Sequence, residues 1–440
     1  MTRARRSRDA SEMKRIEPRK KPLRGSIAVP GDKSMAHRAV IFSAVAQGRS
    51  RILNLSGGDD NSRTVRAFRQ MGVEIFRDGD ALCVEGKGWD GLRAPGETIN
   101  CGNSGTTLRL LSGLLSGQAF HSELDGDASL RQRPMRRVID PLSEMGARIR
   151  SRHGDGLAPL EIDGGGLRGI NYRMPIASAQ VKSAIVLAAL QAEGQTIIHE
   201  PQRSRDHTEV MLSGFGGKVS VDGLTIAIAG RPALSGQSVR IPGDISSAAF
   251  FLAAAAMIPG SDLIIRDVGC NPTRDGVVEV LKRMGASIEL SNRRLEAGEP
   301  VADIHVIGGH LKGVDVGEDL VARTIDEYPI LAVAAAIAQG VSTFSDVKEL
   351  RFKESDRIAA MSEGLRALGV SVEERADGMT IRGGRRLQSG AVKSYGDHRI
   401  AMSFAIAGLV SENGVEIDDA ACVDISFPSF FDLLAQICLH

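Results

Sequence analysis

The sequence predicts an α/β protein of two domains, each built from three copies of one unit of strands and helices. Three observations lead to this prediction. The chain has 440 residues, more than one ordinary hydrophobic core accommodates, so that two domains of about 200 residues are expected. Five segments share one helix-to-strand ending, and six polar turns each open an apolar helix. Repetition of this kind indicates that one unit has been used several times.

The shared ending consists of an amphipathic helix, an apolar residue, a glycine and an alternating strand. Glycine just past a helix accommodates the left-handed C′ conformation, and alternation with period two is typical of a half-buried strand. The apolar residues that precede the glycine are Met71, Met145, Phe215, Met284 and Leu368. We therefore expect a helix before and a strand after each of these positions.

The second shared element is a polar turn that opens a helix rich in alanine and leucine. Segments 248–257 and 330–338 have little polar face, so that these helices are expected to be buried among other elements. The six turns lie at residues 31–34, 102–105, 177–180, 243–247, 326–328 and 396–399.

The ends of the repeats predict how the chain divides into domains. The sixth unit ends with a helix at 427–437 and lacks a final strand, whereas a spare strand, residues 26–29, lies near the N-terminus. We expect this strand to complete the sixth unit. Residues 23–30 and 243–440 would then form one discontinuous domain and residues 31–242 the other.

Two similar segments would join these domains, Val29-Pro30-Gly31-Asp32 and Ile241-Pro242-Gly243-Asp244. Their Pro-Gly pairs predict hinges near residues 30–32 and 242–244, on which the domains close around a ligand. Ordinary β-turns without motion are the alternative.

The net charge of +1 is the sum of a basic N-terminus and an acidic remainder. Residues 1–24 contain ten basic and three acidic side chains, a charge of +7, which leaves −6 for the rest. Such a segment can bind nucleic acid or direct targeting, but this one has no apolar stretch and no amphipathic pattern. We therefore expect residues 1–22 to be a disordered, solvated tail, with no nucleic-acid partner.

Two further absences narrow the class of protein. No stretch of roughly 18 uncharged apolar residues occurs, which argues against a membrane span. The five cysteines include no C-x-x-C pair, so that reduced cysteines in the cytoplasm are expected rather than disulfides or a zinc site.

Cations are concentrated at the predicted helix starts. The amide groups at the N-terminus of a helix attract anions, whereas cations there oppose the macrodipole and need a separate reason. Scattered surface ion pairs, worth about 0–1 kcal/mol each, would explain any single residue, but for the set a site for several phosphates, or for phosphate and carboxylate, is favoured. The cations are Lys33, Arg38, Arg133, Arg205, Lys353, Arg357 and Arg399.

Two carboxylates, Asp326 and Glu354, occur among these cations. Spacing alone gives Asp326 and Asp356 the structural role of a helix cap. Glu354 is neither a cap nor part of an apolar stripe, and a carboxylate beside Lys and Arg can transfer a proton if closure buries it. No nucleophilic triad and no metal-ligand spacing stands out, so that no metal is expected.

Seven ordered motifs, between about residues 23 and 431, closely resemble the 5-enolpyruvylshikimate-3-phosphate synthase family. They lie at residues 30–38, 102–106, 131–134, 178–183, 326–329, 353–357 and 397–399. The resemblance implies two inside-out α/β barrels, each of three βαβαββ units about a pseudo-threefold axis. It also implies a cytoplasmic monomer that transfers enolpyruvyl from phosphoenolpyruvate to the 5-hydroxyl of shikimate 3-phosphate and releases phosphate, without metal or organic cofactor.

The resemblance assigns roles to individual residues. Shikimate 3-phosphate would be held by Lys33, Ser34, Arg38, Ser178, Ala179, Gln180, Arg205, Asp326 and Lys353. Phosphoenolpyruvate would be held by Lys33, Gly105, Arg133, Gln180, Arg357 and Arg399. Asp326 would be the base for the 5-hydroxyl, and Glu354 or Lys33 would carry the proton to the methylene carbon.

Two positions qualify this assignment. Many members have a lysine two residues before the final Phe-Pro, where this chain has Ile425. Without this lysine, phosphoenolpyruvate would be bound only by Lys33 and the arginines. Members with glycine at the position of Gly105 tend to admit the inhibitor glyphosate, so that the chain is expected to be a glyphosate target.

Two alternatives to this function differ in what they require. The UDP-N-acetylglucosamine enolpyruvyl transferase has the same fold and donor, but normally carries a cysteine in a mobile loop, and residues 121–133 contain none. Its first motif would also read Lys-Asn where this chain has Lys33-Ser34. A catalytically silent anion-binding paralogue could keep the cations but would not need Asp326 and Glu354.

Overall fold

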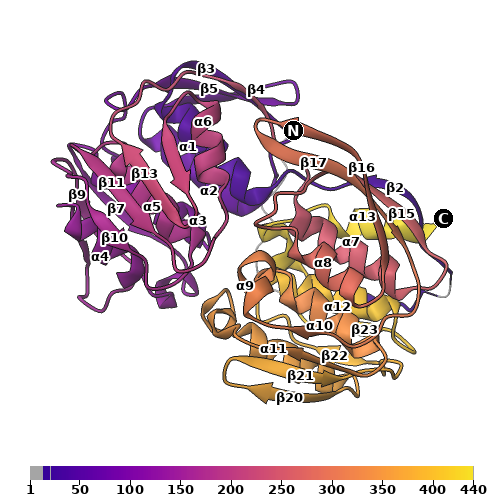
Figure 1. Ribbon diagram of the computed structural model, residues 1–440. Helices are drawn as coiled ribbons and strands as arrows, with labels where there is room; N and C mark the ends of the chain where they lie inside the picture. Colours follow the sequence, from indigo (N-terminus) through magenta and orange to yellow (C-terminus); the bar gives the residue numbers. More distant parts are fainter. Residues whose placement is uncertain (1–12, 20, 440) are drawn as a thin grey trace, which may run out of the picture.

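The computed structural model describes residues 13–19 and 21–439, which form six β-sheets and two hydrophobic cores. The two cores correspond to two lobes (Figure 1). Buried residues between Met35 and Ile241 make the core of the N-terminal lobe. Ile16, buried residues of the segment 23–29 and those from Ile245 to Ile437 make the core of the C-terminal lobe.

The N-terminal lobe contains three four-stranded sheets. In order across each sheet, the strands are β14 (Ser238–Arg240), β3 (Gln47–Leu53), β5 (Ala81–Lys87) and β4 (Glu74–Asp78); β6 (Ile99–Asn100), β7 (His121–Asp125), β9 (Leu160–Asp163) and β8 (Arg148–Ser151); and β10 (Asn171–Arg173), β11 (Gln195–His199), β13 (Thr225–Ala229) and β12 (Val219–Asp222).

The C-terminal lobe contains two four-stranded sheets and one of three strands. The strands are, in order, β2 (Arg24–Ala28), β15 (Asp262–Gly269), β17 (Glu299–Ile307) and β16 (Ser287–Glu296); β18 (Asp315–Val316), β19 (Val341–Phe344), β21 (Gly378–Arg382) and β20 (Ser371–Arg375); and β22 (Gly390–Val392), β23 (Val415–Ile417) and β1 (Lys14–Ile16).

The helices alternate with these strands. In the N-terminal lobe they are α1 (Lys33–Val45), α2 (Asp59–Gln70), α3 (Gly105–Ser116), the 3-10 turn η1 (Leu130–Gln132), α4 (Arg136–Glu144), α5 (Ala179–Ala189) and α6 (His207–Gly214). In the C-terminal lobe they are α7 (Ile245–Met257), α8 (Gly276–Arg283), α9 (Glu318–Thr324), α10 (Tyr328–Ile337), η2 (Lys348–Phe352), α11 (Arg357–Ala367), α12 (His398–Leu409), η3 (Ala421–Ile425) and α13 (Phe430–Leu439).

Five of the six sheets repeat one pattern of strands, in agreement with the predicted repeat. In all five four-stranded sheets a first strand pairs in parallel with the second, and the remaining pairs are antiparallel. In three of these sheets one or two helices lie between the parallel strands along the chain, as α3 does between β6 and β7, because parallel neighbours need a long crossover. In the other two sheets the parallel partners, β2 with β15 and β14 with β3, are distant in sequence. The mixed α/β class follows directly from this unit.

The assignment of the N-terminal strand to the sixth unit is wrong. Strand β2 pairs in parallel with β15 and so begins the fourth unit, where its indigo ribbon lies beside the orange strands (Figure 1). Strand β14, at the end of the third unit, begins the first unit by pairing with β3. Each lobe therefore contains a strand whose continuation, α1 or α7, lies in the other lobe.

The expectation of a disordered tail is wrong for its second half. Lys14–Ile16 forms strand β1, which pairs antiparallel with β23 and enlarges the sheet of the sixth unit. The Arg19 amide also donates to the carbonyl of Leu409. A three-residue strand has no measurable period, so that the sequence pattern could not predict β1. Residues 1–12, the first part of the predicted tail, lie outside the described residues.

The five predicted helix-to-strand endings are all confirmed. Helices α2, α4, α6, α8 and α11 are followed by strands β4, β8, β12, β16 and β20. The glycine between helix and strand has a positive φ in every case, from 81° at Gly369 to 98° at Gly285. An L-residue with a side chain is strained in this region, which is why glycine recurs there.

The predicted apolar helices are buried at the centres of the lobes. Every residue of α7 is buried, and α7, α10 and α12 pack on one another. In the N-terminal lobe α3 and α5 approach so closely that a Cβ at Gly113 would lie 2.0 Å from the Ala184 carbonyl oxygen. No helix in the described residues is long and apolar enough to cross a membrane.

Replacement of Ile16 by alanine tests whether β1 is part of the folded core. Ile16 is only 9% exposed. A Cβ atom added at Gly408, in helix α12, would lie 2.7 Å from the Cβ atom of Ile16, so that strand β1 and helix α12 are in close contact. We expect Ile16→Ala to lower the free energy of unfolding in urea by about 2 kcal/mol through the lost packing. Met13→Ala is the control, because Met13 is 71% exposed; equal stability of both variants would contradict the docking of β1.

Candidate active site

A cavity of about 320 Å³ lies between the two lobes. Residues at the N-terminal ends of six helices line it, α1, α3 and α5 from one lobe and α7, α11 and α12 from the other. Backbone amides at a helix N-terminus lack intrahelical acceptors and favour negative charge. Their convergence makes the cavity a site for anions.

The cavity brings together all but one of the residues to which the resemblance assigns a role in binding or catalysis. Those that line it are Lys33, Ser34, Gly105, Arg133, Ser178, Ala179, Gln180, Arg205, Asp326, Lys353, Glu354, Arg357 and Arg399. They come from both lobes, which explains why no short stretch of sequence contains them. Their individual roles toward a substrate remain predictions.

Arg38 is the exception, since it is buried behind the cavity and not at its surface. Its guanidinium donates to the hydroxyl oxygens of Thr208 and Ser183, both at 2.6 Å, and to the Ser34 carbonyl oxygen at 2.9 Å. Burial lowers the pKa of Arg38 to about 10. In this structure Arg38 fixes the backbone of Ser34.

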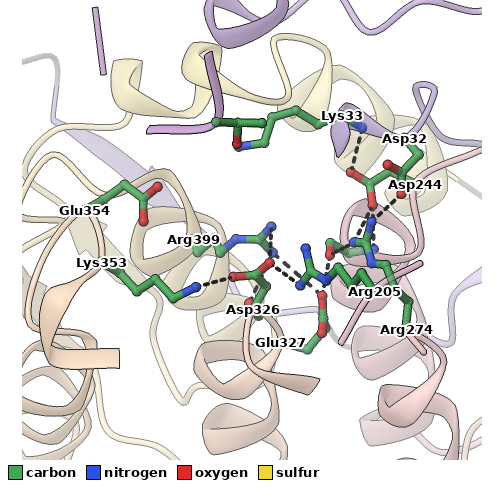
Figure 2. A network of polar contacts seen from close by, with 12 residues as sticks. Asp32, Lys33, Arg205, Asp244, Arg274, Asp326, Glu327, Lys353, Glu354 and Arg399 are labelled. Atoms are coloured by element: carbon green, nitrogen blue, oxygen red, sulfur yellow. Dashed lines mark hydrogen bonds and ion pairs between the residues drawn. The ribbon is translucent and has the colours of Figure 1, made fainter. Parts of the chain in front are cut away.

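Asp326 is the centre of a group of cations. Arg205, from the N-terminal lobe, forms a short ion pair with its carboxylate, and the Lys353 Nζ atom lies 3.4 Å away (Figure 2). Arg357 and Arg399 approach to 3.6 and 3.9 Å. Burial alone would raise the pKa of Asp326, but these cations, Lys353 foremost, lower it well below its usual range. The carboxylate is therefore ionised and able to accept a proton.

The helix-cap role expected for Asp326 is wrong. Helix α10 begins after Glu327, and no side-chain cap hydrogen bond forms there. The same expectation is confirmed for Asp356, whose carboxylate accepts from the Ala359 amide at 3.0 Å. The two aspartates look alike in sequence and differ only in which groups the fold places beside them.

Glu354 is paired with two cations, one of which, Arg357, it shares with Asp326. Its carboxylate pairs with Arg357 at 2.7 Å and with Arg133, from the opposite lobe, at 3.6 Å. Burial raises the pKa of Glu354, but Arg357 and Arg133 outweigh burial and lower the pKa well below its usual range. Nη1 of Arg357 is buried and has no hydrogen-bond partner in the described residues, which leaves a donor for an anionic ligand.

The remaining residues of the N-terminal lobe are held by neighbours. Lys33 pairs with Asp60 at 2.8 Å. Ser178 is the N-cap of α5, and the side chain of Gln180 donates to the Thr106 hydroxyl at 2.9 Å. These contacts orient the polar groups before any ligand is bound, which reduces the entropy lost on binding.

Several residues of the cavity were missed by the sequence reading, notably Arg109 and Arg274. Arg109 donates to the Gln180 side chain at 2.5 Å, and burial lowers its pKa to about 9. It lies one helical turn after Gly105, so that helix periodicity could have identified it. Arg274 lies outside every predicted helix start, and only the tertiary structure brings it to the cavity.

Ile425 does not line the cavity. It ends η3 and packs against the core of the C-terminal lobe. Its main chain instead meets the N-terminal lobe, since a Cβ at Gly58 would lie 2.7 Å from the Ile425 carbonyl oxygen.

A buried charge cluster holds the loop that carries Arg205. The Lys182 Nζ atom lies 3.0 Å from Glu200 and 2.7 Å from Glu209, and all three side chains are almost fully buried. Glu200 also accepts hydrogen bonds from the amide and hydroxyl of Ser204, the residue before Arg205. The cluster therefore sets the position of residues 204 and 205 at the cavity wall.

The groups that line the cavity can bind two anionic molecules and can transfer protons to and from them. Cations from both lobes supply the binding, and two ionised carboxylates supply acid–base chemistry. Among the residues that the structure describes, no group of three His, Cys, Asp or Glu side chains has the arrangement of a metal site.

Comparison with known proteins agrees with this picture. The model of the family described as EPSP synthase (3-phosphoshikimate 1-carboxyvinyltransferase) matches residues 18–434. The chain is 50% identical over 417 residues to a Geobacter metallireducens protein named 3-phosphoshikimate 1-carboxyvinyltransferase, covering 95% of this chain and 97% of that one. It is 52% identical over 414 residues to the protein of the same name from Pelobacter propionicus, covering 94% and 96%.

A solved structure shares the fold. The EPSP synthase from Acinetobacter baumannii superimposes with a TM-score of 0.86 at 44% identity, covering 97% of this chain and 98% of that one. The likeness therefore includes both lobes.

Replacement of Lys182 by methionine tests the anchoring cluster. Two buried carboxylates would face each other without a counter-ion, so that we expect Lys182→Met to lower the free energy of unfolding in urea by about 3–5 kcal/mol. Adding Glu209→Gln removes one of the charges and should reverse part of this loss. Lys218→Met, at an exposed position, is the control; similar stability of Lys182→Met and Lys218→Met would contradict the cluster's role.

Proposed function

Because the chain belongs to the EPSP synthase family, we propose that it transfers the enolpyruvyl group of phosphoenolpyruvate to the 5-hydroxyl of shikimate 3-phosphate, with release of phosphate. The observation that carries this proposal is the cavity between the lobes, in which cations from both lobes surround two ionised carboxylates. The proposed reaction is that of a 3-phosphoshikimate 1-carboxyvinyltransferase, which belongs to the biosynthesis of aromatic compounds.

The two substrates divide the cavity. Shikimate 3-phosphate lies against Ser34, Ser178, Ala179 and the cations Arg205 and Lys353. Phosphoenolpyruvate lies against Gly105, Arg133, Arg357 and Arg399, with Lys33 and Gln180 shared between the substrates. All of these residues lie in the wall of the one cavity, as this division requires. Arg38 acts on shikimate 3-phosphate indirectly, through the backbone of Ser34.

The chemistry is an addition followed by an elimination. The 5-hydroxyl oxygen attacks C2 of phosphoenolpyruvate and gives its proton to Asp326. A proton is delivered to C3 by Lys33, or by Glu354 once it has taken up a proton in the substrate complex. The group that delivered the proton to C3 then takes one back from the new methyl group as the bond between C2 and the phosphate oxygen breaks. The double bond between C2 and C3 forms again, and the released phosphate takes up the proton that Asp326 accepted. The residues do this without a metal or organic cofactor, by fixed orientation and electrostatic stabilisation.

The cations that surround the carboxylates explain how the substrates change their basicity. Arg205, Lys353 and Arg399 now balance Asp326. When substrate phosphate and carboxylate groups take up these cations, less positive charge remains for Asp326, so that its pKa rises toward the range of a useful base. The same argument applies to Glu354, which shares Arg357 and Arg133 with the donor.

Binding would be coupled to closure of the two lobes. Strand β1 and residues 23–30 with 243–440 form one domain and residues 31–242 the other, with hinges near residues 30–32 and 242–244. The separate hydrophobic cores support this division. We further propose that each domain is an inside-out α/β barrel about a pseudo-threefold axis, and that the enzyme acts as a cytoplasmic monomer.

An assay of phosphate release with both substrates tests the function. We expect Asp326→Ala and Glu354→Ala to lower kcat by roughly 10²- to 10⁴-fold, because each removes a group that moves a proton. Glu373→Gln, on the exposed side of β20, is the control that should leave the rate unchanged. No release by well-folded wild-type protein would favour a silent anion-binding paralogue, and release with UDP-N-acetylglucosamine as the acceptor would favour the rival transferase.

Inhibition by glyphosate tests the donor pocket. A Cβ at Gly105 would lie 3.0 Å from Nη1 of Arg109 and 3.2 Å from Nη1 of Arg133, so that a methyl group there narrows the space for an inhibitor. We expect the wild type to be inhibited and Gly105→Ala to raise the inhibition constant by roughly tenfold or more, about 1.4 kcal/mol. Gly96→Ala is the control, since no atom lies within 4 Å of its Cβ position. An inhibition constant that barely changes in Gly105→Ala would contradict the proposal.

A further inference from the structure

The two segments that cross between the lobes are bonded to each other. The Asp32 amide donates to the Pro242 carbonyl at 2.8 Å, and the Asp244 amide donates to the Pro30 carbonyl at 2.9 Å. Gly31 and Gly243 form an isolated antiparallel bridge between them. The two crossings are therefore one structural unit, whose parts move together.

Arg274 binds both crossings from the side. Its Nη1 atom donates to Asp32 at 2.5 Å, and Nη2 donates to Asp244 at 3.2 Å and to the Ser246 hydroxyl at 2.5 Å. Only 3% of the residue is exposed. Since both Nη atoms are occupied by protein acceptors, Arg274 acts on the cavity through other residues.

The two acceptors are the caps of two central helices. Asp32 accepts from the Met35 amide at the start of α1, and Asp244 accepts from the Ser246 amide at the start of α7. The Lys33 amide in addition donates to Asp244 at 3.4 Å. A single guanidinium thus fixes the start of one helix from each lobe, directly beside Lys33.

The charges in this cluster depend on Arg274. The two buried carboxylates share one guanidinium, and they raise the pKa of Arg274 even though burial lowers it. Against the effect of burial, Arg274 and nearby cations lower the pKa of Asp32 to about 2. Burial and the charge of Asp32 raise the pKa of Asp244. Without Arg274, the carboxylates would repel each other in a medium that screens them poorly.

The cluster continues to the base of the reaction. The Ser246 hydroxyl donates to Glu327, whose carboxylate lies 3.9 Å from Nη1 of Arg399 (Figure 2). The same Nη1 atom donates to the Asp326 carbonyl oxygen at 3.1 Å. A continuous set of polar contacts therefore runs from the crossings to Asp326.

We propose that Arg274 is a positioning residue, which sets Lys33 from one lobe and Arg399 from the other at the distance that the reaction requires. The proposal rests on the proposed function, because it concerns the geometry of that cavity. It predicts that charge balance at the crossings, and not the stability of the fold alone, controls turnover.

The first test replaces Arg274 with glutamine. We expect kcat for phosphate release to fall by roughly ten- to hundredfold, because charged groups from the two lobes are displaced. Amide hydrogen exchange in residues 31–35 and 243–247 should become faster than in the wild type, without any substrate present. Because amide exchange needs no substrate, this second measurement tests the contact of Arg274 with the two crossings even if the wild type has another activity.

The second test restores charge balance in the absence of Arg274. Asn is as good a helix cap as Asp, so that Arg274→Gln combined with Asp244→Asn removes the repulsion and keeps the cap of α7. We expect the double variant to regain a large part of the lost kcat with little change in KM. A purely structural role predicts the opposite, since the double variant has lost one more ion-pair partner.

Arg152→Gln is the matched control, because Arg152 also joins two carboxylates, Glu123 and Glu161, but on the exposed surface of the N-terminal lobe. Its kcat and amide exchange at the crossings should equal those of the wild type. A folded Arg274→Gln variant with wild-type kcat and exchange would overturn the proposal, as would a double variant with no more activity than Arg274→Gln.

Discussion

The exchange of two strands between the lobes is the constraint on which the architecture depends. Strands β2 and β14 each begin a sheet in one lobe, and the helix that follows each of them in sequence lies in the other. The chain must therefore cross twice, at neighbouring points. A double connection restricts the relative movement of the lobes far more than a single linker would, and it brings the starts of α1 and α7 to the edge of the cavity.

The repeated unit then explains why the cavity attracts anions. Because each unit starts its buried helix at the same end of the sheet, the helices of a lobe present their N-terminal amides on one side. Where the two lobes face each other, these ends add their positive potential to that of the arginines and lysines. Asp326 and Glu354 balance part of this charge, and each is bound by a cation from the opposite lobe, Arg205 or Arg133. The lobes are thus held together by the same ion pairs that a substrate would replace.

Local patterns in the sequence were sufficient to predict the repeated units. They could not predict which strands pair when the partners are distant in sequence. The glycines after Met71 and Leu368 are required by a single backbone angle, so that their neighbours in sequence suffice to identify them. The partner of β2 is chosen by packing among strands more than 200 residues away, and a period-two pattern carries no information about it. The same holds for the site: Lys33 and Arg357 could be recognised from their motifs, whereas the position of Arg274 depends on contacts with two segments that are distant in sequence.

The carboxylates of the cavity have two functions that cannot be separated by substitution. A buried arginine without a counter-ion would be costly, so that Asp326 and Glu354 stabilise the cations whenever the cavity is empty. As proposed proton carriers, the two carboxylates must also become more basic when substrate binds. This change follows directly when the cations exchange the carboxylates for the anionic groups of the substrate. Arg357 shows the coupling most clearly, since it contacts Asp326, Glu354 and Asp397 at once. An anion that binds Arg357 therefore alters both carboxylates, which links binding in one half of the cavity to proton transfer in the other.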